Sequence, residues 1–261
     1  MGLGNVTAVF LFEWRRALTG PRMVWWAVMA LFPVFIITLI RFGPDSERLP
    51  PEMWTASLFG LVPMLISMLG TFLWTTPAVS AELERKSWVY LAVRPHGSTA
   101  VLLGKYLAAV TWVVPAALVG LTISVAIAPL EETWRIWWAM ARLVFLSCPA
   151  YAAIYLVLGV MFPKRSMVIA VAYTLIFELL ASFVPALINT LTVQYRLRSL
   201  FVYWTDFPLG NSEQLGAIAL VSDAPTWFQV TVLLVYTFCL LVTAITLIRW
   251  CEFSQAAESD L

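Results

Sequence analysis

The chain has 261 residues, of which 61% are hydrophobic and 12% are charged, and its formal net charge at pH 7 is +1. Soluble domains average about 45–50% apolar and 25% charged residues, so this composition indicates a protein embedded in a lipid bilayer. A net charge near zero gives no basic field that would bind nucleic acid, and three widely spaced cysteines favour neither a disulfide framework nor a metal site.

Six apolar runs are long enough to cross a bilayer as helices, which takes about 20 residues each. In chain order they cover residues 23–40, 54–80, 106–130, 143–162, 167–191 and 228–248. Only the fifth run contains a charged side chain, Glu178. The sequence therefore predicts an all-α polytopic membrane protein, with six transmembrane helices in one domain over residues 1–261.

Lysines and arginines are unevenly divided between the two sides of these spans. Ten lie on the side of the N-terminus and five on the other, with Arg142 at a boundary. Because cytoplasmic loops carry the excess of Lys and Arg, we expect a cell (inner) membrane protein with both termini cytoplasmic. The first run is too long for a signal-peptide core, so it should stay as the first span. Residues 130–142 then predict a short amphipathic helix in the outer interface, ahead of the fourth span.

The longest inner loop, residues 81–105, gathers six charged side chains. Its first part predicts a helix from about Ser80 to Val93, which Arg94 and Pro95 end. On such a helix Glu82, Arg85 and Lys86 share one face. The helix could present these charges to a soluble partner, or the charges could simply be solvated; the loop by itself supports both interpretations.

The stretch ELERKSWVYLAVRPHGSTAVLLGKYLA, residues 82–108, resembles the signature of ABC-2 type transporter permeases. In that signature an acidic-led stretch after the second span is followed by a Leu, an Arg-Pro pair and a Gly-Lys pair that opens the third span. The corresponding residues are Glu82, Leu91, Arg94, Pro95, Gly104 and Lys105. The chain departs from the family at Lys86-Ser87, where Gly-Thr is frequent, and at His96-Gly97. The stretches FEWRRALTGPR before the first span and FPKRSMVIAVAYTLIFELL at the fifth resemble the same family.

This resemblance implies the transmembrane permease subunit of an ATP-driven transporter, of the exporting kind. Such permeases pair with a second permease copy, as a homo- or heterodimer, and with cytoplasmic ABC ATPase subunits that hold ATP and Mg²⁺. In these permeases, the first inner loop forms a coupling helix that is seated on the ATPase, and an interface helix before the first span supports it. Carried over residue by residue, the ATPase-coupling residues are Glu82, Glu84, Arg85, Lys86, Arg94 and Pro95, and the interface helix, residues 12–22, contains Glu13, Trp14, Arg15 and Arg16.

The chain itself lacks an ATP-binding device. The stretch GSTAVLLGKY has six residues between its glycines where a phosphate-binding loop has four, and Tyr106 stands where Ser or Thr would bind magnesium. His96, the single histidine, has no nucleophile or acid around it in a catalytic pattern. We therefore expect no enzyme activity, no catalytic or metal-binding residue and no cofactor in this chain, with ATP hydrolysis carried by a partner.

Glu178 and the outer segment, residues 192–227, complete the candidate sites. A carboxylate in the middle of a span is expected to contact a substrate or a proton in a conduit, or to form a structural hydrogen bond between helices. The aromatic outer segment matches the re-entrant or interfacial helices that form an outer gate in the resembled family, and an interfacial cap is the other interpretation. Two further functions compete with the permease: a proton-coupled secondary transporter using Glu178, and a non-transporting assembly subunit of a membrane complex.

Overall fold

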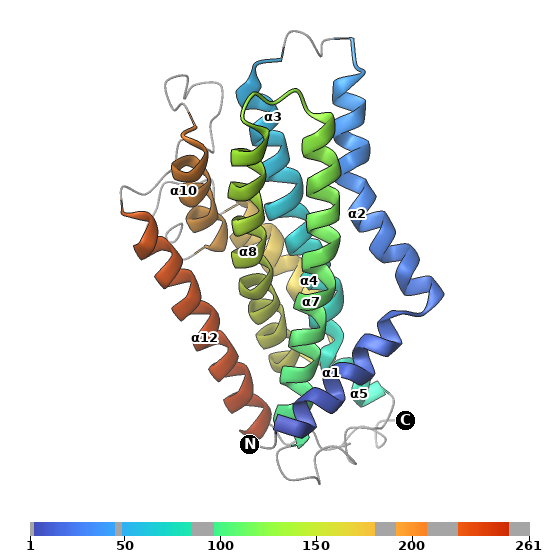
Figure 1. Cartoon of the computed structure of the whole chain (residues 1–261). Helices are drawn as coiled ribbons and strands as arrows, with labels where there is room; N and C mark the ends of the chain where they lie inside the picture. Colours follow the sequence, from blue (N-terminus) through green and yellow to red (C-terminus); the bar gives the residue numbers. More distant parts are fainter. Residues whose placement is uncertain (1–2, 45–48, 85–96, 181–191, 208–223, 251–261) are drawn as a thin grey trace.

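The computed structural model describes residues 3–44, 49–84, 97–180, 192–207 and 224–250. All regular elements within these ranges are helical, which confirms the prediction of an all-α protein. Long helices pack side by side into an elongated bundle, with the shorter α1 (Leu3–Ala17) lying obliquely at one end (Figure 1).

Among the described residues, five helical segments are long and apolar enough to cross a membrane, which confirms a multi-pass membrane protein. They are α2 (Gly20–Arg41), the helical series Pro51–Glu82, α7 (Gly97–Ile127), α8 (Thr133–Met161) and α12 (Thr226–Trp250). The predicted fifth span is represented by a shorter apolar stretch, α9 (Ser166–Tyr173) with η4 (Thr174–Leu180). Its remaining residues, 181–191, lie outside the described residues, so a crossing by this fifth run, and with it a total of six spans, stays a prediction.

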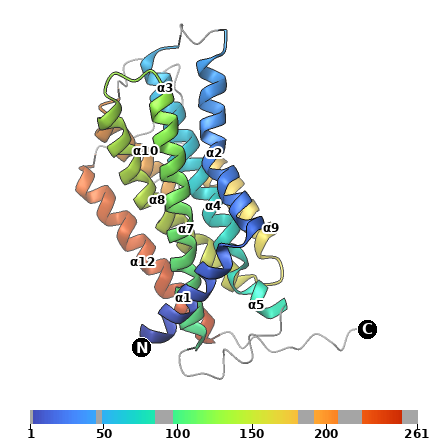
Figure 2. The same ribbon diagram turned by 45° about the vertical axis from the view of Figure 1, so that its right-hand side comes forward.

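The directions of the helices require the chain to return between α8 and α12. Both helices run toward the end of the bundle where α7 begins (Figure 1). Two contacts support this arrangement: Arg249 near the end of α12 lies 3.4 Å from Thr99 at the start of α7, and Gly159 near the end of α8 packs against Thr76. The segment α9–η4, in yellow in Figure 2, begins this return, and α9 contacts α8 and η3.

The second predicted span consists of several helical pieces rather than one uniform helix. In order these are α3 (Pro51–Phe59), the π-helical η2 (Gly60–Ile66), α4 (Ser67–Thr75), the 3₁₀ turn η3 (Thr76–Ala78) and α5 (Ser80–Glu84). Pro63 lies inside η2 and Pro77 inside η3. Because proline has no N–H group and clashes with the preceding turn, it changes the helical hydrogen-bond pattern at both places.

Helix α8 forms the centre of the bundle and contacts α4, α7, α10 (Val193–Thr205) and α12. Its side chains from Ala150 to Leu156 are almost entirely enclosed, including the large rings of Tyr151 and Tyr155. Outer helices α2 and α12 instead expose many apolar side chains. This distribution is expected of a bundle whose surroundings are lipid rather than water.

Two boundaries predicted from the sequence are wrong. Residues 130–142 do not form a separate interfacial helix, because α8 begins at Thr133 and continues through Arg142 without interruption. The inner loop does not extend to Lys105, because α7 already begins at Gly97 and Lys105 is buried within it. In both places the predicted boundary was set at a charged residue, whereas these cations have partners: Arg142 lies 5.3 Å from the Trp204 ring, and Lys105 is ion-paired.

Candidate functional site

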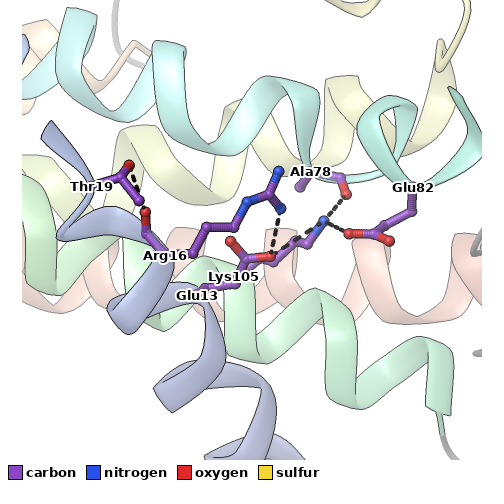
Figure 3. A network of polar contacts seen from close by, with 6 residues as sticks. All are labelled: Glu13, Arg16, Thr19, Ala78, Glu82 and Lys105. Carbon is purple, nitrogen blue, oxygen red and sulfur yellow. Dashed lines mark hydrogen bonds and ion pairs between the residues drawn. The ribbon is translucent and has the colours of Figure 1, made fainter. Parts of the chain in front are cut away.

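The candidate site is a group of charged side chains at the end of the bundle where α1 lies, here named the Lys105 cluster. It consists of Glu13 and Arg16 from α1, Glu82 from α5 and Lys105 from α7 (Figure 3). Lys105 Nζ lies 2.5 Å from Glu82 Oε1 and 3.9 Å from Glu13 Oε1, and it donates a hydrogen bond of 2.8 Å to the carbonyl oxygen of Ala78. A single ammonium group therefore links α1, α7 and the end of the second span.

The pair between Lys105 and Glu82 is largely shielded from solvent. The side chains are 9% and 12% exposed, respectively. A charge removed from water is costly unless it is paired and hydrogen-bonded, and here the ammonium group contacts three acceptors. On the α1 side, Arg16 lies 3.7 Å from the same oxygen of Glu13, so the carboxylate lies between two cations. The cluster is thus a set of mutually dependent charges.

Close packing between α1 and α7 places the cluster. Gly104, beside Lys105, faces Val9 so closely that an added Cβ would lie 2.7 Å from the Val9 Cγ1 atom and 3.2 Å from the backbone nitrogen of Phe10. Further along both helices, Trp14 Nε1 donates a 2.8 Å hydrogen bond to Thr111 Oγ1, and its ring packs edge-on against the Trp112 ring, with 5.4 Å between ring centroids. Helix α1 is therefore attached to α7 by apolar packing, a hydrogen bond and the charged cluster.

The predicted interface helix, residues 12–22, corresponds to parts of two helices, and its interface role stays a prediction. Helix α1 ends at Ala17, and Arg22 belongs to α2, because Gly20 and Pro21 begin a new helix after the Thr19 cap. Leu11 and Phe12 are exposed on α1 while Glu13 and Arg16 point into the cluster, as expected for an amphipathic helix at a membrane surface. Arg15 is exposed.

The predicted ATPase-coupling residues do not share one environment. Glu82 is buried in its pair with Lys105. It is therefore not the exposed docking charge that the family resemblance implies. The backbone of Glu84 ends α5. Arg85, Lys86, Arg94 and Pro95 lie outside the described residues, as does most of the predicted coupling helix. The two described stems of that loop are α5 and the start of α7, which Glu82 and Lys105 join.

Lys105, Thr111 and Trp112 were not predicted as site residues. Lys105 was noted only as part of the family-like Gly-Lys pair and was counted as an ordinary inner-loop cation. A signal was present nevertheless. No helix-breaking residue separates Lys105 from the apolar run that follows it, so the lysine is expected to belong to the spanning helix and to need an acidic partner. Nothing in the sequence identifies which carboxylate this is.

Glu178 occupies a second buried site, at the junction of η4, α8 and α10. Its carboxylate accepts hydrogen bonds from Tyr151 at 3.3 Å, Tyr173 at 3.2 Å and the backbone N–H of Gln194 at 3.3 Å. Burial lowers the pKa of Arg198 in α10, and the negative charge of Glu178 acts in the opposite direction. These hydrogen bonds join η4 to α8, α9 and α10, as the structural interpretation of Glu178 requires.

The described part of the outer segment packs into the bundle. Phe201 of α10 is fully enclosed and stacks on Phe59 of α3 at 4.4 Å between ring centroids. Thr192 caps the helix by accepting from the Tyr195 N–H, and Arg135 of α8 pairs with Asp206 at the other end. Residues 208–223 lie outside the described residues, so a gate in this segment stays a prediction.

Among the described residues, no three His, Cys, Asp or Glu side chains are grouped to hold a metal ion. No protein-family model and no curated protein matches the chain. The likeness to ABC-2 type permeases therefore rests on the residues quoted from the sequence.

Proposed function

We propose that this chain is the membrane subunit of an ATP-driven transporter, resembling ABC-2 type permeases, and that the loop 85–96 is the contact for a separate cytoplasmic ATPase. ATP and Mg²⁺ belong to that partner. A second permease copy completes the membrane unit, both termini lie in the cytoplasm, and the substrate is moved outward.

The observation that carries this proposal is the position of Lys105. Its ammonium group bonds to Glu82 and to the Ala78 carbonyl on one side of the loop, while Lys105 itself belongs to the helix on the other side. The stems of the loop are thereby fixed to one another. Glu13 adds α1 to the same group of charges.

This arrangement is suited to transmitting a displacement. A push on residues 85–96 acts on α5 and α7 together, because breaking their shielded ion pair would leave charges buried without partners. The displaced helices are the ends of two spans, and α7 is also in contact with α1, α2 and α8. Closure of two ATPase subunits beneath the membrane would thus tilt several helices as a unit.

The competing functions are supported by fewer observations. A proton-coupled transporter would use Glu178, whose three hydrogen bonds connect η4 to α8 and α10. The same bonds serve equally for a purely structural carboxylate. A non-transporting assembly subunit would need the bundle alone and gives no reason for a shielded ion pair across the loop stems.

Co-purification tests the proposal. The tagged protein is isolated from membranes of its source cells, and the ATP hydrolysis that accompanies it is measured for wild type, for Arg85→Ala with Lys86→Ala, and for the control Arg135→Ala at the opposite end of the bundle. We expect hydrolysis with wild type and control, and at least about a tenfold loss with the loop variant, as removal of interfacial ion pairs weakens binding. Wild-type protein free of ATPase, or equal hydrolysis with the loop variant, contradicts the proposal.

A further inference from the structure

A cavity of about 330 Å³ lies next to the Lys105 cluster, between α1, α2, α4 and α7. Its volume is at the lower end of the range of about 300–1,000 Å³ that is typical of small-molecule sites. The charged side chains in its lining are Glu13, Arg16, Arg22 and Lys105. The transport proposal makes no use of this cavity.

The charges around the cavity do not balance. Lys105 is paired with Glu82, and Arg16 lies 3.7 Å from Glu13. Three cations and two carboxylates leave one positive charge over, that of Arg22. Among the described residues, no carboxylate lies within ion-pair distance of the Arg22 guanidinium.

The Arg22 guanidinium also has unused hydrogen-bonding capacity. Its Nη1 atom is buried and makes no hydrogen bond to any described residue. Its central carbon lies 5.1 Å from the centre of the Trp74 ring, which fixes the group beside the cavity by a cation–π contact. A buried donor without an acceptor costs free energy, so an acceptor brought by a ligand would be favourable.

An anionic ligand fits this lining better than a cationic one. Tryptophans such as Trp14, Trp74 and Trp112 would suit a quaternary ammonium group if their faces were free. The Trp74 ring already carries Arg22, however, and a second cation would be repelled by the uncompensated charge. A phosphate group supplies both the missing negative charge and several acceptors for a guanidinium fork.

The surface that continues from the cavity is apolar. Trp25, which lines the cavity, is 62% exposed, and spacing of three and four residues along α2 places further exposed apolar side chains on the same face. These are Val28, Phe32, Phe35 and Leu39. Arg22 lies in the first turn of this candidate spanning helix. The ends of a spanning helix are expected near the lipid phosphate groups.

We propose that this cavity binds the phosphate group of an anionic membrane phospholipid, with the acyl chains lying along the exposed stripe of α2. Arg22 provides the principal contact to the phosphate, and Arg16 adds a second positive charge nearby. The lipid belongs to the leaflet on the side of α1. It fills a space between α1 and α2 and thereby supports the position of α1 against the bundle.

Native mass spectrometry of the purified full-length protein in detergent tests this. The protein is titrated with dioleoyl phosphatidylglycerol and, separately, with dioleoyl phosphatidylcholine, which has the same acyl chains but no net charge. We expect one retained phosphatidylglycerol with clear preference over phosphatidylcholine. Arg22→Gln should weaken phosphatidylglycerol binding about tenfold, the effect expected from removing one charge-assisted hydrogen bond.

Three controls separate the outcomes. Arg41→Gln, at the opposite end of the same helix, should bind like wild type, and Arg22→Lys should retain more binding than Arg22→Gln. A large excess of inorganic phosphate should not displace the lipid. Equal retention of both lipids by wild type, unchanged binding by Arg22→Gln, or displacement by inorganic phosphate would overturn the proposal. Should Arg22→Gln fail to fold, the binding of the two lipids to wild type and to Arg22→Lys still tests the proposal, because equal retention of both lipids by wild type would overturn it.

Discussion

Lys105 joins three elements because one ammonium group reaches two carboxylates and a backbone carbonyl in a place with little solvent. At an exposed position such contacts contribute less than about 1 kcal/mol. In a shielded position, the loss of one partner leaves the others as buried charges, which typically costs 3–5 kcal/mol.

The first prediction concerns this dependence. Lys105→Met should lower the free energy of unfolding by about 3 kcal/mol, because Glu82 loses its cation and Glu13 keeps only Arg16. The double variant Lys105→Met with Glu82→Gln should be more stable than Lys105→Met alone, because the buried carboxylate is removed as well. Unfolding in mixed detergent micelles measures the free energy of unfolding of the single and the double variant.

Arg135→Met is the matched control for that cycle. Arg135 also pairs with two carboxylates, Glu132 and Asp206, but all three side chains are well exposed. Its loss should cost less than about 1 kcal/mol. If Lys105→Met lowers the free energy of unfolding no more than Arg135→Met does, the shielded Lys105 cluster stabilises the fold no more than an exposed ion pair, which contradicts the prediction.

Glu178 gives the second prediction at this scale. Glu178→Leu should lower stability by about 3 kcal/mol, since it removes the acceptor of Tyr151, Tyr173 and the Gln194 N–H inside the bundle. Glu178→Gln keeps one acceptor, and rotated tyrosine hydroxyls can accept from its amide, so it should cost about 1 kcal/mol. Thermal unfolding in detergent distinguishes the two substitutions, and equal stability of both variants would contradict a structural role.

At the scale of the elements, the contact of α1 with α7 depends on the absence of a side chain at Gly104. An added methyl group would meet Val9 and the backbone of Phe10 in α1. Gly104→Val should therefore displace α1 and lower stability by about 1–3 kcal/mol, the usual cost of overpacking. Limited proteolysis within α1, together with the thermal midpoint, measures both effects.

Gly60→Ala is the control for this substitution. Gly60 is also helical, and no heavy atom lies within 4 Å of its added Cβ apart from its own helix and chain neighbours. Alanine should be tolerated there or should stabilise slightly. An unchanged proteolysis pattern in Gly104→Val would show that α1 is not held by this close approach.

Sequence patterns predict the membrane-crossing helices well, because a long apolar run has few alternatives to a helix in lipid. The runs at residues 23–40 and 228–248 correspond to α2 and α12 within a few residues. The predicted starts of the third and fourth spans are wrong, because each was placed directly after a charged residue, Lys105 and Arg142. Whether a charge ends a helix in such a protein depends on tertiary partners, here Trp204 and Glu82, and these are far away in the sequence.

The candidate site was predicted only in outline. The sequence contains an inner loop rich in charge, and the resemblance to ABC-2 type permeases implied an interface helix before the first span. Their connection could not be predicted, because it depends on Glu13, Glu82 and Lys105 meeting across 92 residues of chain. Tyr151 was hidden for the same reason, since it comes from α8, whereas Tyr173 lies five residues from Glu178 in the same predicted span.

At the scale of the whole molecule, the described beginning and end of the chain lie at one end of the bundle, together with the Lys105 cluster (Figure 1). The excess of lysine and arginine predicts that this end faces the cytoplasm. The opposite end carries exposed groups such as Phe42 at the end of α2. A cytoplasmic motor can contact only one of these ends.

Site-specific photo-crosslinking tests the central claim most directly. A benzoylphenylalanine is introduced in place of Lys86, and in a matched variant in place of Phe42, and membranes of the source cells are irradiated. The account predicts that position 86 crosslinks to a soluble protein that also becomes labelled by azido-ATP, while position 42 does not. No crosslink from position 86 to an ATP-binding protein, with the protein folded and present in the membrane, would contradict the account, as would such a crosslink from position 42.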